Sequence, residues 1–228
     1  MLIRCDLHVH SALSPCADDD MTPANIVGYA KLLGLDAVAI ADHNAIGNVA
    51  VAVEVGKAYG VCVVPAMELQ TAEDIHVLCL FPTTERLQSF FDEIEFSKLA
   101  NDPSVFGSQL IVDEDDNVVA TEPRLLHVGA NIAVEKVPDL ARKHGGVAVA
   151  AHVDRDENGM VAILGEVIAE YGAVELSSHA TAAHRKAYSD KVVVTNSDAH
   201  WLDRIGHCIG TLEVTENTAE AIVKALTY

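Results

Sequence analysis

Histidine and acidic side chains gather in this sequence at the points where short apolar runs end. The residues concerned are His8 and His10, Asp42 and His43, Glu68, His76, His152, Glu175, His179, and Asp198 and His200. Imidazole and carboxylate groups are common protein ligands of zinc, manganese and iron ions. Metal-ion binding is therefore the chemistry that these residue types could support.

Two of these groups have a spacing of two residues. In a strand this spacing turns both side chains to the same side, so His8 and His10 would point together, as would Asp198 and His200. One such pair is weak evidence, and His76, which lies inside an apolar run, could equally be a core histidine. Six imidazoles and two carboxylates at successive strand ends, however, would be costly to bury without metal ions or ion pairs. The sequence therefore predicts a multinuclear metal site.

The elements that must position these residues alternate between apolar runs and helical stretches. We expect strands over 2–9, 37–41, 61–66, 75–81, 146–151, 173–177 and 192–195, with an edge strand over 209–214. We expect helices over 22–33, 46–59, 84–99, 133–144, 160–171, 181–189 and 218–226. This order predicts an α/β fold with a largely parallel sheet. About seven core strands favour a (β/α) barrel, in which the carboxyl ends of all strands meet at one face.

The alternation is interrupted at residues 100–131. Residues 109–112 and 118–121 are rich in β-formers and flank the acidic run Asp113-Glu114-Asp115-Asp116-Asn117. This pattern predicts a β-hairpin inserted into one domain that spans residues 1–228. We interpret the acidic run as a solvated turn.

The composition excludes several classes of protein. With 15 Lys and Arg against 34 Asp and Glu, the net charge is −19, which disfavours a duplex nucleic-acid partner and an anionic membrane surface. The five cysteines form no Cys-x-x-Cys pair, which indicates reduced thiols. The N-terminus has no apolar signal core, and no run approaches the roughly 18 apolar residues of a spanning helix. We therefore expect a cytoplasmic protein, whose oligomeric state the sequence leaves open.

Six segments match the motifs of a known family in the family's order. They are DLHVHS, ADHN, PAMEL, IHVLC, AHVDR and NSDAH, which together run from residue 6 to residue 200. With these motifs the chain resembles the polymerase-and-histidinol-phosphatase (PHP) domain, one of the amidohydrolase-like metal hydrolases. The resemblance implies a distorted seven-stranded (β/α) barrel. It also implies two or three divalent ions (Mn, Zn or Fe) that take part in hydrolysing phosphate esters.

The resemblance also implies a set of metal ligands. One ion would bind His8, His10, Glu68 and Asp198; a second, His43, His200 and a residue of the loop 14–21; a third, Glu68, His76 and His152. Glu68 would then bridge two ions. We take Asp18 as the loop ligand, because it precedes the expected helix cap at a suitable distance, and keep Cys16, Asp19 and Asp20 as alternatives.

The expected reaction is attack of a metal-bridging hydroxide on phosphorus. We expect the substrate to be a small molecule, either a phosphomonoester or a cyclic phosphodiester of a sugar, nucleoside or amino alcohol. Arg155 is the candidate phosphate-binding residue and His179 the candidate proton donor to the leaving oxygen. Asp6 and Asp42 are expected to orient ligands or to hold loops.

Two other functions stay open. An exonuclease or oligonucleotide phosphodiesterase is disfavoured by the absence of a basic stripe and of an aromatic stacking platform. A metal-binding scaffold without catalysis is the non-enzymatic alternative. The leading expectation is thus a small phosphorylated substrate, with neither duplex nucleic acid nor a membrane as partner.

Overall fold

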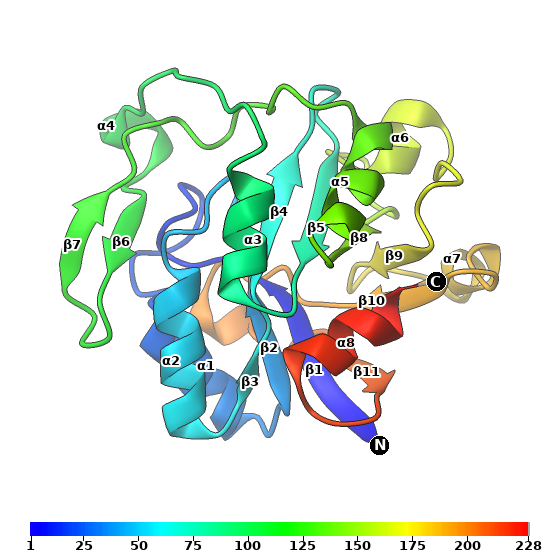
Figure 1. Ribbon diagram of the computed structural model, residues 1–228, viewed down its shortest axis with the longest axis horizontal. Helices are drawn as coiled ribbons and strands as arrows, with labels where there is room; N and C mark the ends of the chain where they lie inside the picture. Colours follow the sequence, from blue (N-terminus) through cyan, green and yellow to red (C-terminus); the bar gives the residue numbers. More distant parts are fainter. Residues whose placement is uncertain (228) are drawn as a thin grey trace.

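Two β-sheets with helices packed around them form the computed structural model, which describes residues 1–227 (Figure 1). The first sheet has the strand order β11 (Gly210–Glu213), β1 (Leu2–Val9), β2 (Ala37–Ile40), β3 (Cys62–Val63). The second has the order β10 (Val192–Thr195), β9 (Ala173–Leu176), β8 (Val147–Ala150), β5 (His76–Leu80), β4 (Ala66–Gln70). The predicted α/β fold is therefore confirmed.

The sheets are only partly parallel. Strands β1, β2 and β3 run parallel, as do β8, β9 and β10, whereas β11 is antiparallel to β1 and β5 is antiparallel to both β4 and β8. The sheets approach one another at both edges, where β2 lies near β4 and β10 near β11. Over residues 1–227 these edges do not join into one hydrogen-bonded ladder, so the closed seven-stranded barrel is not confirmed. The strand at one of the edges, β3, is only two residues long, which leaves little backbone to continue the ladder.

The helices follow most of the predicted stretches. They are α1 (Pro23–Leu32), α2 (Val49–Tyr59), α3 (Thr84–Phe91), α4 (Pro103–Phe106), α5 (Val137–Lys143), α6 (Met160–Leu164), α7 (Ala182–Ala187) and α8 (Ala219–Leu226), with short 3-10 turns η1 (Val134–Lys136) and η2 (Leu202–Arg204). The Thr22 side chain caps α1 by accepting the N–H of Asn25, as the sequence predicts. Helix α6 is shorter than predicted, because Gly165 adopts a left-handed conformation (φ 87°) that ends it.

The predicted hairpin is present. Strands β6 (Leu110–Val112) and β7 (Val118–Thr121) pair antiparallel and stand apart from the two sheets, at the left of Figure 1. The Asp113 carboxylate accepts the backbone N–H groups of Asp115 and Asn117, which holds the turn, while residues 114–117 are exposed. The acidic run is therefore a solvated turn, as predicted.

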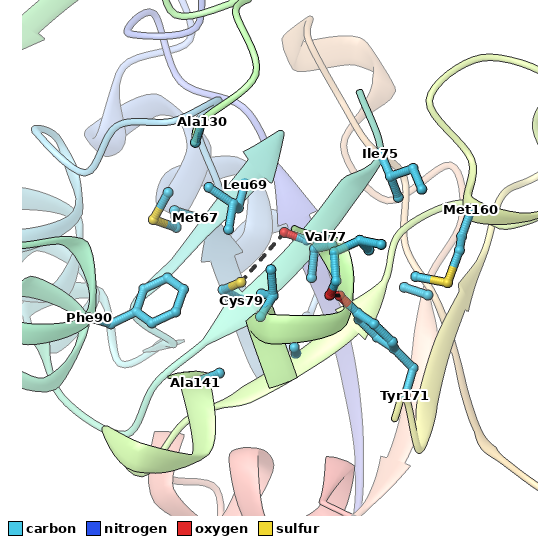
Figure 2. Packing of buried hydrophobic residues seen from close by; sticks show 14 of the residues in the cluster. Met67, Leu69, Ile75, Val77, Cys79, Phe90, Ala130, Ala141, Met160 and Tyr171 are labelled. Carbon is cyan, nitrogen blue, oxygen red and sulfur yellow. Dashed lines mark hydrogen bonds between the residues drawn. The ribbon is translucent and has the colours of Figure 1, made fainter. Parts of the chain in front are cut away.

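The largest apolar cluster lies against β4 and β5. Figure 2 shows Met67, Leu69, Val77 and Cys79 of these strands facing side chains from several helices and loops. Tyr171, fully buried in this cluster, donates its hydroxyl to the Val134 carbonyl oxygen at 2.8 Å. This packing fixes the pair of strands that carries Glu68 and His76.

All five cysteines are free. Within residues 1–227, no helix is both long enough and apolar enough to cross a membrane.

Two helical glycines give a matched test of the packing of α2 on the first sheet. A Cβ at Gly56 would lie 2.5 Å from Cγ2 of Val63 and 2.8 Å from the Val61 carbonyl oxygen, whereas at Gly28 the nearest atom is 3.8 Å away. We expect Gly56→Ala to lower the free energy of unfolding by about 1–3 kcal/mol. Gly28→Ala should raise it by about 0.5–1 kcal/mol, because alanine favours the helix. Urea denaturation measures both, and equal effects would contradict this description of the packing.

Candidate metal centre

The predicted ligands come together at one end of the two sheets. His8 lies in β1 and Glu68 in β4, and β5 begins at His76. In the antiparallel β4–β5 pair His76 is opposite Gln70, which turns His76 to the same face as Glu68. A backbone bridge between His43 and Glu68 joins the end of β2 to β4. A second bridge, between Val9 and Ala199, brings the segment with Asp198 and His200 beside β1.

Glu68 is the centre of the cluster. Its carboxylate is 1% exposed. Its two oxygens lie between 2.9 and 3.4 Å from ring nitrogens of His8, His10, His43, His76 and His152. Burial alone would raise the pKa of this carboxyl, but the surrounding imidazoles, His76 and His8 foremost, hold it well below its usual value. Glu68 is therefore an ionised carboxylate surrounded by imidazoles.

Two ring nitrogens face each other beside Glu68. Nε2 of His8 lies 3.2 Å from Nε2 of His10. Nδ1 of His8 lies 3.0 Å from both oxygens of Glu175, so it carries the proton that it donates there. Nδ1 of His10 lies 2.9 Å from the Ser14 hydroxyl. That hydroxyl donates its own proton to Asp42, so it accepts from His10.

These contacts leave a lone pair on each of the facing Nε2 atoms of His8 and His10. Oδ1 of Asp198 lies 3.0 Å from Nε2 of His10 and 3.5 Å from Nε2 of His8. Two lone pairs and a carboxylate oxygen so close together repel one another unless a cation stands among them. That cation is either a metal ion or a proton on Nε2 of His8, because burial lowers the pKa of His8 but the neighbouring carboxylates, Glu175 first, raise it well above its usual value.

Unpaired polar atoms give an independent test of whether a metal ion fits. Buried atoms without a hydrogen-bond partner include Nδ1 of His43, Oε2 of Glu68, Nδ1 of His152 and Oδ1 of Asp198. Buried polar atoms in proteins are nearly always paired, so four such atoms in one cluster require an explanation. Groups of donor atoms within 4.8 Å of one another include His8, His10 and Asp198; His10, His43 and His200; and His43, Glu68 and His76. The residues therefore fit divalent metal ions.

The buried carboxylate of Glu175 contacts two of the candidate ligands, His8 and His152. Glu175 contacts Nδ1 of His8, accepts the backbone N–H of His152 at 3.0 Å and accepts the Asn196 amide at 2.7 Å. The sequence places Glu175 at a strand end, but its partners there could not be derived, because they come from three other segments. Such a carboxylate fixes the tautomer and orientation of a metal-binding imidazole.

The two aspartates that precede ligand histidines act on loops. Asp42 accepts the N–H of Ser11 and the hydroxyls of Ser11 and Ser14, so it reaches His10 through Ser14. Asp6 accepts the backbone N–H groups of Ser197 and Gly206. These positions agree with the expected orienting and loop-holding roles.

The loop after β1 brings Cys16, and not Asp18, to the cluster. Donor atoms of Cys16, His43 and His127 all lie within 4.8 Å of one another. Asp18 is exposed, and its Oδ1 accepts the N–H of Asp20 at 3.0 Å; Asp19 and Asp20 are exposed as well. The contacts of Asp18 thus give no support to its expected role as a ligand.

Sequence reasoning missed His127. This residue lies in the 100–131 segment, outside any strand-end pattern, and its ring centroid is 4.6 Å from that of His43 in an edge-on arrangement. His127 is exposed at the surface, yet partial desolvation and then the neighbouring imidazoles, His43 first, lower its pKa to about 4.

Of the two residues expected to act on substrate, only Arg155 lies at the cluster. Nη1 of Arg155 is 2.5 Å from Oδ2 of Asp198. A cavity of about 140 Å³ lies over the cluster, and the residues lining it include Arg155 together with His43, Glu68, His76, His152, Asp198 and His200. His179 is exposed and is not among the lining residues of this cavity, so its role as proton donor stays a prediction.

Comparison with solved structures shows that the chain has the fold of PHP-like metal-dependent phosphoesterases, which confirms the family resemblance at the level of the fold. A two-domain protein from Bacteroides vulgatus that contains a predicted PHP-like metal-dependent phosphoesterase matches with a TM-score of 0.59 and 15% identity, over 99% of this chain and 62% of that chain. The sequence matches neither a protein-family model nor a curated protein.

Two structures of endonuclease Q are also similar. The lesion-specific endonuclease Q of Pyrococcus furiosus matches with a TM-score of 0.70 and 23% identity, over 99% of this chain and 56% of that chain. Endonuclease Q in complex with a 27-mer duplex, with an abasic lesion at its active site, matches with a TM-score of 0.72 and 22% identity, over 99% of this chain and 56% of that chain. This chain thus spans just over half the length of those proteins.

These neighbours contradict two expectations. They are a small phosphorylated molecule as substrate and the exclusion of duplex nucleic acid, of which the second rests on the net charge of −19. Endonuclease Q, which has this fold, takes duplex DNA at its active site. The net charge is a poor guide here because it averages over the whole surface, whereas recognition depends on the local field at the site.

Glu175→Gln tests whether the Glu175 carboxylate orients His8 for metal binding. Glutamine keeps the shape but accepts the His8 proton less strongly, so we expect affinity for zinc to fall about 10- to 100-fold. Competition with a chromophoric chelator measures this affinity. The control is Glu170→Gln on the exposed surface, which should leave it unchanged. Equal zinc affinity in Glu175→Gln and the wild type would show that Glu175 does not orient His8.

Proposed function

We propose that this chain is a metal-dependent nuclease that hydrolyses phosphodiester bonds of DNA. The observation that carries the proposal is the pair of facing nitrogens of His8 and His10 beside Glu68 and Asp198, which calls for cations at this point. The likeness to endonuclease Q supports DNA as the substrate. This chain spans only 56% of the length of those proteins, so the proposal does not extend to which lesion or DNA structure is cleaved.

The proposed ligands are His8, His10, His43, Glu68, His76, His152, Asp198 and His200, which together would hold two or three ions of zinc, manganese or iron. When bound, such ions lower the pKa of water and neutralise charge on a phosphoryl group. Glu68 would supply a negative charge to neighbouring ions. Asp198 supplies a second carboxylate at the rim, where its Oδ2 also receives Arg155.

Arg155 is the phosphate-binding residue of the proposal. Its guanidinium lies at the edge of the cavity over the cluster and is about one-third exposed, with a side-chain exposure of 36%. A guanidinium binds two oxygens of a phosphodiester at once, which orients the group over the ligand cluster. The ion pair between Arg155 and Asp198 keeps the arginine in this position.

The size of the cavity limits what it can enclose. About 140 Å³ is well below the roughly 300–1,000 Å³ of pockets that surround a drug-sized ligand. The cavity can therefore take a phosphoryl group, while the nucleobases of the substrate lie outside it.

Trp201 offers a surface for such a base. It directly follows the ligand His200, is 53% exposed, and its ring centroid lies 6.0 Å from that of His200. The backbone on both sides is held, because the His200 carbonyl accepts the N–H of Asp18 and the Trp201 carbonyl accepts the N–H of Arg204. Stacking on an aromatic ring needs no positive charge, which suits an acidic protein.

Catalysis is tested with a fluorescent DNA oligonucleotide, single-stranded and duplex, with and without an abasic site, in the presence of manganese or zinc. We expect hydrolysis that chelation abolishes and that Asp198→Asn lowers at least about 100-fold, since a ligand and its charge are lost. The control Asp203→Asn changes an exposed aspartate on η2 and should keep full activity. Stoichiometric metal without hydrolysis of any oligonucleotide would instead support a non-catalytic scaffold.

Trp201 is the only tryptophan of the chain, so its fluorescence reports on base stacking directly. We expect a single-stranded oligonucleotide to quench it, and an abasic strand of equal length to quench it far less. Trp201→Ala should weaken binding by about 1–3 kcal/mol, as for the loss of one stacked base, and Trp201→Phe by less. Fluorescence anisotropy of a labelled strand measures the affinity. Normal binding with unchanged tryptophan emission would remove Trp201 from the proposed site.

A further inference from the structure

We propose that Cys16 and His127, together with His43, bind a metal ion, so that one corner of the metal centre has a thiolate ligand. Their donor atoms lie within 4.8 Å of one another although they come from three distant segments. This inference concerns coordination alone, and it stands whether or not the protein cleaves DNA.

The His127 segment is fastened to the residue after His43. The amide nitrogen of Asn44 donates to the carbonyl oxygens of Leu126 at 2.9 Å and Val128 at 3.0 Å, on either side of His127. Asn44 is 1% exposed and has a positive φ of 46°, a conformation that asparagine tolerates better than most residues. The same side chain thus fixes where His127 sits relative to His43.

The other side of the His127 segment is also held. The Gln109 side chain, fully buried, accepts the N–H of Leu126 at 3.2 Å and donates to the Arg124 carbonyl oxygen at 2.6 Å. The insertion 100–131 therefore does more than extend the surface, because its last part is built to present one imidazole to the cluster.

The Cys16 loop is fastened to His43 from the opposite direction. The Ser14 hydroxyl accepts the backbone N–H of His43 at 3.2 Å, and the Ser14 carbonyl accepts the N–H of Ala17 at 3.0 Å in a tight turn around Cys16. The next residue, Asp18, donates its N–H to the His200 carbonyl oxygen at 3.0 Å. Cys16 is thus pinned between two segments that carry proposed ligands.

His43 has one ring nitrogen left for this corner. Its ring is buried, with an exposure of 5%, and its Nδ1 faces Oε2 of Glu68 at 2.9 Å, so the opposite nitrogen, Nε2, is the one available to a metal ion beside Cys16 and His127. The His127 ring stands edge-on to the same imidazole.

The chemistry of the donor set selects the ion. A thiolate with two imidazoles favours zinc, iron or cobalt over manganese and magnesium, which prefer oxygen ligands. Binding displaces the thiol proton to solvent and leaves the sulfur as the ligand. With Asp18 in the place of Cys16, the same corner would have had only nitrogen and oxygen donors and no such preference.

Cobalt substitution tests the thiolate directly, because a sulfur–cobalt bond gives a charge-transfer band in the near ultraviolet that nitrogen and oxygen ligands do not give. We expect this band on loading the full-length protein with Co²⁺. Cys16→Ser should abolish it while circular dichroism shows an intact fold. The control is Cys62→Ser, which changes a half-buried cysteine on β3 and should keep the band.

Two further variants test His127 and Asp18 as metal ligands. His127→Ala should alter the visible cobalt spectrum and lower affinity for zinc more than about 100-fold. A residue that only orients a ligand would cost about 10- to 100-fold. Asp18→Asn should change neither the spectrum nor the affinity. The proposal is overturned if the wild type has no charge-transfer band, if the band survives Cys16→Ser, or if His127→Ala keeps the wild-type spectrum and zinc affinity. None of these readouts depends on hydrolysis, so failure here is distinct from failure to cleave DNA.

Discussion

One buried carboxylate dominates the structure. Glu68 lies in the middle of β4 with its oxygens 2.9–3.4 Å from five ring nitrogens. An isolated buried carboxylate is very costly, and it is tolerated only with compensating positive charge and hydrogen bonds. The short β4, its antiparallel pairing with β5 and the bridge to His43 all place imidazoles around this one group. Neutral imidazoles alone would leave its charge uncompensated, so the arrangement makes physical sense around cations.

Three more buried carboxylates lie around the imidazole cluster, and hydrogen bonds compensate their burial. Glu175, Asp42 and Asp6 are buried, and each accepts hydrogen bonds from at least two other positions, so each joins loops while orienting ligands. Two of the proposed ligands also have strained backbones: φ is 28° at His152 and 50° at Asp198. Residues held in this region cost of order 1–3 kcal/mol each and persist where neighbouring structure over-determines them. The cluster is therefore held by tertiary contacts that the strands alone could not provide.

These features explain what the sequence can and cannot predict. The spacing of His8 and His10 indicates a shared face, because side-chain alternation in a strand is a local rule. Asp198 and His200 are expected to follow the same rule, but they lie beyond the end of β10, and the left-handed backbone of Asp198 (φ 50°) is not that of a strand. The split into two sheets depends on how few residues of β3 pair and on the antiparallel turn into β5, which no local rule determines. His127 could not be predicted, since it belongs to no strand end and its position beside His43 depends on the side-chain hydrogen bonds of Asn44 and Gln109.

The acidic residues that give the net charge of −19 are divided between the buried cluster and the exposed surface. Glu68, Glu175 and Asp198 lie inside the cluster among imidazoles, and Asp18, Asp19 and Asp20 are exposed on the loop that reaches His200. An acidic rim repels the phosphate backbone of DNA, so the proposed nuclease would bind DNA at the site itself and not through a basic surface. The proposed sources of affinity there are the metal ions, the guanidinium of Arg155 and stacking on Trp201. All three act on a single nucleotide and its phosphate, so together they would recognise a local feature of the bound DNA.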